Sequence, residues 1–98
     1  MRELRVTNVR FNSDTVKKLH TISDLRCREE EKATSVYTFT IWPKQKVYDA
    51  LTSGNSHFYT EVDDYRADVI PINDQHGQYV KTKPDSTGVD NLLRLPEF

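Results

Sequence analysis

The residues best suited to hold a ligand lie near the end of the chain. Asp90 and Asn91 are two short polar side chains placed directly before the apolar pair Leu92-Leu93. Such side chains cap a helical turn or bond open backbone amides, and they also serve as ligand contacts. We expect the structural role for this pair and keep ligand binding as the alternative.

Tyr79 and Lys81 form a second candidate site, because alternate residues of a strand share one face. An aromatic ring beside a cation can hold a nucleotide or an acidic group. The simpler alternative is a tyrosine at the rim beside a lysine whose stem covers apolar surface. Trp42 and Arg94 complete the set of candidate ligand-binding residues.

The other reactive side chains give little support for catalysis or for a metal site. Cys27 lies between Arg26 and Arg28, which favours its thiolate, but no histidine nearby in sequence is placed as its base. A single cysteine also excludes an internal disulfide and a zinc site built on cysteines. Two further groups lack the spacing of a metal site: His20, His57 and His76, and Glu61, Asp63, Asp64 and Asp68. We therefore expect no enzyme, no metal and no cofactor.

A basic and aromatic set of residues is the best candidate for gripping phosphate. Its members are Lys17, Lys18, Arg26, Arg28, Lys44 and Lys46, with Tyr37 and Trp42 close by. On one face they would bind phosphate while a ring stacks on a base. Alternating strands would instead scatter them over two faces, and the second half of the chain is acidic. Nucleic acid is therefore not an expected partner.

The first 42 residues contain neither glycine nor proline and predict long extended segments, with a first turn at residues 12–14. In the first segment Leu4 and Val6 have one parity, whereas Val9 and Phe11 have the other. A bulge near residues 7–8 would bring both pairs to the same core.

The next stretch is less regular. Residues 16–28 combine apolar residues at every third position with poor helix formers, and we favour a strand over a helix. Residues 26–32 carry six charges and predict an exposed loop. Beyond them, Tyr37, Phe39 and Ile41 alternate with threonines, which predicts a half-buried strand.

A short helix is predicted over residues 43–53. Pro43 suits a first helical position, Val47, Ala50 and Leu51 follow at helical spacing, and Gly54 supplies a left-handed stop.

Three further strands are predicted over residues 57–62, 66–72 and 78–83. Their short connections favour antiparallel neighbours, and Pro71 should lie at a strand end or on an edge. Residues 84–88 predict a turn, and the apolar residues 89–95 predict a C-terminal segment docked on the core.

Composition limits the chain to one small domain covering residues 1–98. Hydrophobic residues make up 36% and charged residues 30%, and ten aromatic side chains provide large pieces for a core. The net charge of −1 hides a basic half (+3 over residues 1–49) and an acidic half (−4 over residues 50–98). With no leader and no long apolar segment evident, we expect a soluble cytoplasmic protein without a membrane partner.

The expected fold is therefore α+β. It is a small, strongly twisted antiparallel sheet of five or six strands, connected as a meander, with one short helix over residues 43–53.

The tail of the chain carries the pattern Tyr-x-x-Thr-x-x-Asp-x-Thr-x-x-Asp-Asn-Leu-x-x-Leu-Pro. Its residues are Tyr79, Thr82, Asp85, Thr87, Asp90, Asn91, Leu92, Leu95 and Pro96. With the short helix before Gly54, this pattern resembles the bacterial and phage domain of unknown function numbered 3892, mainly over residues 42–96. The resemblance implies the fold and a bacterial or phage setting. It implies no catalytic residue and no function.

We expect a small non-enzymatic binding domain whose sheet surface or edge strands contact another protein or a second copy of the chain. The alternative is a phage-type sponge that sequesters a nucleotide signal in counter-defence. The small size of the chain and its arginines and tyrosines, which suit phosphate and base contacts, motivate that alternative.

Overall fold

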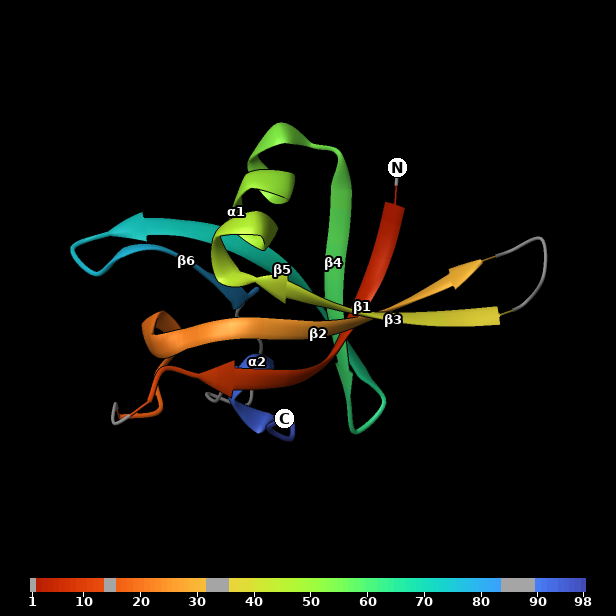
Figure 1. Ribbon diagram of the computed structural model, residues 1–98, viewed down its shortest axis with the longest axis horizontal. Helices are drawn as coiled ribbons and strands as arrows, with labels where there is room; N and C mark the ends of the chain where they lie inside the picture. Colours follow the sequence, from red (N-terminus) through yellow and green to blue (C-terminus); the bar gives the residue numbers. More distant parts are fainter. Residues whose placement is uncertain (1, 14–15, 32–35, 84–89) are drawn as a thin grey trace.

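The computed structural model describes residues 2–13, 16–31, 36–83 and 90–98, which form one mixed sheet and short helices (Figure 1). The sheet order is β3-β2-β1-β4-β5-β6. In chain order the elements are β1 (Arg2–Phe11), the 3-10 turn η1 (Leu19–Thr21), β2 (Ile22–Glu31), β3 (Val36–Pro43), α1 (Lys44–Ser53), β4 (Ser56–Val62), β5 (Tyr65–Asp74), β6 (Gly77–Thr82) and α2 (Asn91–Arg94).

The expectation of a purely antiparallel meander is wrong at the centre of the sheet. Strands β1 and β4 run parallel, with Arg2 opposite Ser56 and Arg5 opposite Tyr59. The other neighbouring strands are antiparallel. Because β3 already lies on the edge beyond β2, the chain returns through residues 44–55 to the free side of β1. Parallel strands need a crossover of about a dozen residues, which α1 and its flanks provide.

The predicted bulge in the first strand is confirmed. The register of β1 against β2 shifts between Val6 and Asn8, which leaves Thr7 as the extra residue. As a result, Leu4, Val6 and Val9 are all fully buried in spite of their different parity.

Two predictions about the first half need correction. The charged residues 26–31 are not a loop, because they form the second half of β2 and pair with β3 along its whole length. Residues 16–28 are only partly strand, since η1 precedes Ile22. The first turn begins after Phe11 as expected, and residue 14, residues 32–35 and the turn at 84–88 lie outside the described residues.

The helix and the last three strands follow the predictions closely. Helix α1 begins at Lys44 rather than Pro43, which ends β3, and Gly54 stops it with a left-handed φ of 76°. Strand β5 pairs with β4 through residues 65–68 and with β6 through residues 69–74. Pro71 therefore lies where β5 has a strand partner on one side only, which suits a residue without an amide hydrogen.

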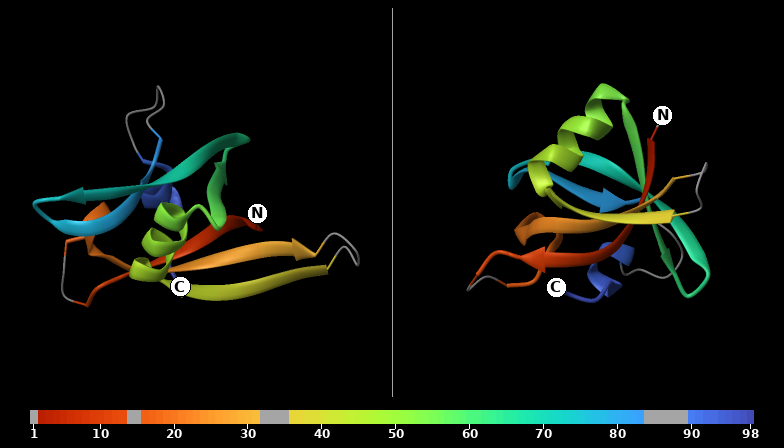
Figure 2. Two further views of the ribbon diagram at one scale, coloured as in Figure 1. Left: turned by 90° about the horizontal axis from the view of Figure 1, so that it is seen from above. Right: turned by 45° about the vertical axis from the view of Figure 1, so that its right-hand side comes forward.

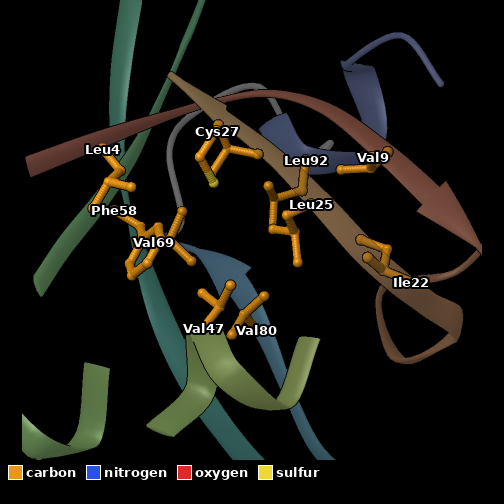
Figure 3. Close-up of a cluster of buried hydrophobic side chains, with 11 residues drawn as sticks. Leu4, Val9, Ile22, Leu25, Cys27, Val47, Phe58, Val69, Val80 and Leu92 are labelled. Atoms are coloured by element: carbon orange, nitrogen blue, oxygen red, sulfur yellow. The ribbon is translucent and has the colours of Figure 1, made fainter. Parts of the chain in front are cut away.

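The core lies inside the curve of this sheet. Its buried residues are Leu4, Val6, Val9, Ile22, Leu25, Cys27, Val47, Phe58, Val69, Val80 and Leu92. Figure 3 shows Val47 reaching the cluster from α1 and Leu92 from α2, on the opposite side. We call the face of the sheet that carries these residues the inner face, and the opposite face the outer face.

Strand β3 is more exposed than its pattern predicts. Tyr37, Phe39 and Ile41 do share a face, but they are 48%, 48% and 55% exposed. The threonines face inward instead, because Thr40 lies opposite the buried Cys27. Residues 29–31 and 36–38 pair with each other beyond the last β1 partner, and the two views of Figure 2 show this end of β2 and β3 projecting from the body.

Candidate interaction surface

The two candidate residues of β6 lie on the same face, as predicted. Tyr79 donates its hydroxyl hydrogen to Asp74 at 2.7 Å, and both it and Lys81 are half-buried. This hydrogen bond is the main reason that the pKa of Tyr79 is raised and the pKa of Asp74 is lowered. The ring of His20 meets Tyr79 edge-on, with centroids 6.2 Å apart. Tyr79 therefore helps to hold η1 against the β5–β6 hairpin.

Asp90 caps α2, the structural role expected for it. Its carboxylate accepts hydrogen bonds from the backbone N–H groups of Leu92 and Thr82, each at 2.9 Å. Asn91 is 1% exposed, and its amide donates from the backbone to the hydroxyl of Thr82 at 3.2 Å. Both polar atoms of the Asn91 side chain are buried, and neither has a hydrogen-bond partner among the described residues. The pair thus fastens α2 to the end of β6.

The last two candidate ligand residues make contacts elsewhere. Trp42 is half-buried on the inner face, where its ring meets Phe58 edge-on at 5.2 Å and its Nε1 donates to Thr40 at 2.8 Å. Arg94 forms an ion pair with Asp63. The described contacts therefore do not gather the six candidate residues into one ligand site.

Cys27 is a core residue. It is fully buried between its two arginine neighbours in sequence, and burial raises the pKa of its thiol to about 12. The thiol is protonated at neutral pH, so the described geometry gives it no character of a nucleophile.

Two histidines that are distant in sequence meet in space, which the sequence spacing did not predict. The rings of His20 and His76 stack with centroids 4.1 Å apart and planes inclined by 8°. Desolvation is the main cause of a lowered pKa at His20, followed by the neighbouring charge of His76. Among the described residues, no group of three or more His, Cys, Asp or Glu side chains could hold a metal ion.

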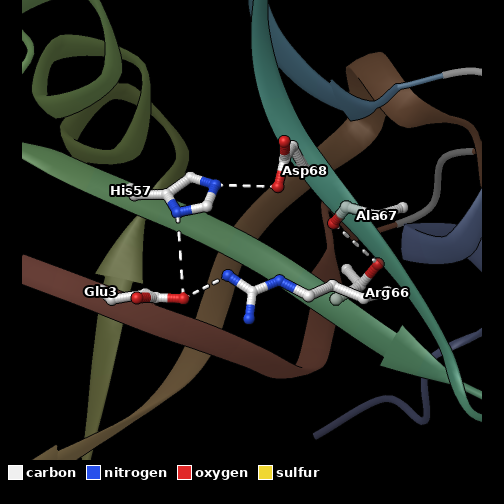
Figure 4. Close-up of polar contacts among 6 residues, drawn as sticks. Glu3, His57, Arg66, Ala67 and Asp68 are labelled. Atoms are coloured by element: carbon white, nitrogen blue, oxygen red, sulfur yellow. Dashed lines mark hydrogen bonds and ion pairs between the residues drawn. The ribbon is translucent and has the colours of Figure 1, made fainter.

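His57 belongs to a polar network on the outer face of β1, β4 and β5 (Figure 4). Its Nε2 lies 2.8 Å from Asp68 and its Nδ1 lies 4.0 Å from Glu3, which also pairs with Arg66. An imidazole beside a carboxylate is a frequent general-base arrangement. Here both ring nitrogens of His57 face carboxylates, one on β1 and one on β5. The network thus joins three neighbouring strands.

The outer face of β2 and β3 carries a different arrangement. The Arg26 guanidinium lies 4.3 Å from the ring centroid of Phe39, and that of Arg28 lies 4.2 Å from the centroid of Tyr37. Ile41 continues the same exposed row. We call these five residues the arginine–aromatic face.

The arginines of this face differ from the others on the outer side of the sheet. Arg5, Arg10 and Arg66 form ion pairs with Glu61, Asp24 and Glu3, respectively. Within the described residues, Arg26 and Arg28 have no carboxylate at ion-pair distance, and Arg26 makes only a long hydrogen bond of 3.5 Å to Asn8. The arginine–aromatic face thus combines exposed apolar area with two positive charges that have no ion pair among the described side chains.

Of the basic and aromatic set proposed from the sequence, only three members converge on this face: Arg26, Arg28 and Tyr37. Trp42 lies on the inner face, Lys17 pairs with Glu97, and Lys44 donates to the carbonyl of His20. Phe39 and Ile41 were missed as surface residues, because an alternating apolar row usually faces the core.

The fold and this surface define a small α+β domain in which the apolar edge strand β3 lies beside two arginines that have no ion pair in the part of the chain that the structure describes. The chain belongs to the family described as protein of unknown function (DUF3892), whose model matches residues 5–96. No curated protein and no solved structure matches it. Among the described residues, no helix is both long and apolar enough to cross a membrane.

Proposed function

We propose that this domain is a non-enzymatic protein-interaction module that binds its partner through the edge of β3 and the arginine–aromatic face. One observation carries the proposal: an eight-residue edge strand without a charged residue exposes three large apolar side chains in a row. Monomeric proteins usually protect such edges with charges, bulges or covering elements.

The rest of the surface supports this choice of site. Single exposed apolar residues are ordinary on any protein, but Tyr37, Phe39 and Ile41 follow one another on one face of the edge strand β3. An uncovered strand also offers backbone N–H and C=O groups for pairing, which is the basis of strand addition. The nucleotide sponge receives no comparable support, since its candidate residues make separate contacts.

Site-specific photo-crosslinking in the cells that produce the protein tests the proposal. A photoreactive amino acid replaces Phe39 in one variant and Tyr65 in a control, because Tyr65 is a strand aromatic of equal exposure (49%). We expect a discrete protein adduct, to another chain or to a second copy, from position 39 alone. Adducts of equal yield at both positions, or none at position 39, would contradict the proposed function.

A further inference from the structure

We infer that the segment recognised by β3 is an extended acidic strand with two glutamates at alternate positions, which pair with Arg26 and Arg28. This inference rests on the proposed function and adds the chemical class of the partner. Its basis is the position of the two guanidinium groups relative to the open edge.

The two arginines are displaced in the same direction along the edge strand. By register, Arg28 lies opposite Phe39 and Arg26 lies opposite Ile41. Their guanidinium groups instead stack on Tyr37 and Phe39, two residues nearer the N-terminus of β3. Each charge that originates on β2 therefore lies against a ring of β3, and an added strand would lie one strand spacing of about 4.8 Å beyond β3.

This placement sets the pattern of the partner. Tyr37 and Phe39 are two residues apart on one face, so the two charges face residues i and i+2 of an added strand. The guanidinium groups lie above the rings rather than in the plane of the backbone, which favours the longer side chain of glutamate over aspartate. A carboxylate there would form charge-assisted hydrogen bonds with the free edge of a guanidinium.

The balance of charge favours this partner over a second copy of the chain. Two copies joined edge to edge would bring together only the uncharged side chains of β3. Arg26 and Arg28 of each copy would then gain no carboxylate from the β3 strand of the other copy.

A single-stranded nucleic acid fits the same surface less well. Bases bind by stacking on aromatic faces, and a guanidinium group already occupies one face of Phe39 and one face of Tyr37. A nucleic acid also leaves the backbone groups of an edge strand unpaired, whereas a peptide strand pairs with them.

Fluorescence anisotropy with labelled synthetic peptides tests the inference. The probe is a short threonine- and valine-rich peptide with glutamate at two alternate positions, and the comparison peptides carry glutamine or lysine there. We expect the glutamine peptide to bind about tenfold more weakly and the lysine peptide to show no binding. Added salt should weaken binding of the glutamate peptide.

Variants of the protein locate the effect. Arg26→Ala and Arg28→Ala should each weaken binding of the glutamate peptide. Arg66→Ala should not, although Arg66 also stacks on an aromatic ring, that of Tyr59 at 4.0 Å, because it pairs with Glu3 away from the edge. The double variant Arg26→Glu/Arg28→Glu should bind the lysine peptide instead, a gain that an unfolded protein cannot show.

Three outcomes would overturn the inference. Equal binding of the glutamate and glutamine peptides would remove the role of the arginines. Binding of a thymidine oligonucleotide that depends on Arg26 and Arg28, with no binding of the glutamate peptide, would assign the face to nucleic acid. A stable dimer in light scattering that is lost in Phe39→Lys, and that excludes the peptide, would assign the edge to a second copy. In the last case crosslinking at position 39 still succeeds, so the proposed function stands while the partner class fails.

Discussion

Strands β6 and β3 form the two edges of the sheet. Strand β6 contacts three other elements, whereas none of the described elements covers the edge of β3. Gln78 of β6 accepts a hydrogen bond from Gln45 of α1, Tyr79 contacts His20 of η1, and Thr82 is bonded by α2. In β3, the outward-facing rings of Phe39 and Tyr37 stack on Arg26 and Arg28 of β2. The edge at β6 is thus covered by other elements, and the edge at β3 carries stacked arginine and aromatic side chains.

This difference separates an edge that is part of the folded core from the edge that we propose for binding. Covering an edge stabilises the domain, because buried contacts replace water at the open backbone groups. An uncovered apolar edge adds little to stability, and apolar area of this kind often marks an interaction site. Substitutions at the two edges should therefore separate stability from binding.

The largest expected effect is that of Asn91→Asp at the covered edge. Asn91 is 1% exposed and its side chain has no hydrogen-bond partner in the described parts of the chain, so we expect an ionised carboxylate there to be buried without compensation. We expect a loss of about 3 kcal/mol or more in the free energy of urea unfolding at neutral pH. Burial raises the pKa of such a carboxyl group, so stability should recover as the pH falls and the group is protonated. Unchanged stability would show that this position is open to water.

Asp90→Ala should have the next largest effect. The substitution removes the cap on Leu92 N–H and the bond to Thr82 N–H, which together hold α2 on β6. We expect a loss of about 2 kcal/mol in urea unfolding. Asp63→Ala is the control, because its ion pair with Arg94 is exposed and should contribute less than about 1 kcal/mol. Equal losses for the two variants would contradict the role assigned to Asp90.

Acid should loosen the contact between η1 and the β5–β6 hairpin. The pKa of His20 is lowered, mainly by desolvation and then by His76, Lys18 and Lys44 against the opposing charge of Asp74. A histidine with a lowered pKa in the folded state contributes stability above its unfolded pKa and loses it as the pH falls through that value. We expect the melting temperature of the native protein to fall more than that of His20→Gln between neutral and mildly acidic pH. Parallel curves would show that the stack is not coupled to stability.

The smallest expected effect is that of Phe39→Lys at the open edge. Phe39 is 48% exposed and its ring stacks on Arg26, so the change should alter the unfolding free energy by less than about 1 kcal/mol. Tyr65→Lys, at a strand position of equal exposure, is the matched control. A loss comparable to that of Asp90→Ala would show that β3 is covered in solution and would remove the contrast between the edges.

Local features of the fold could be predicted from the sequence because they depend on neighbouring residues. The change of parity between Val6 and Val9 required a bulge, and Thr7 is the extra residue. Gly54 ended the helix in the left-handed region, as its lack of a Cβ allows.

Features that depend on distant residues could not be predicted in this way. The parallel pairing of β1 with β4 could not be predicted from either strand, since the paired segments, residues 2–5 and 56–59, alternate in the way common to parallel and antiparallel strands. Phe39 faces outward because its register partner on β2 is Arg28. The inner face of β2 at this point is occupied by the buried Cys27, which lies opposite Thr40. The stack of His20 on His76 likewise follows from the curl of the sheet. Periodicity separates the two faces of a strand, but only its neighbours decide which of them is inside.

The parallel pairing of β1 with β4, which we call the seam, also affects the order of folding. Strands β1 to β3 and strands β4 to β6 are each connected by short segments, so both sets can pair locally. The seam joins Arg2 to Ser56 and closes a loop that includes β2, β3 and α1. Closing a long loop costs more conformational entropy than closing a short one, and this cost precedes the stabilising contacts. Pairing of residues that are distant in sequence therefore slows folding. We therefore expect the basic half (β1 to β3) and the acidic half (β4 to β6) to form early. Pairing of β1 with β4 should then be the rate-limiting step of folding.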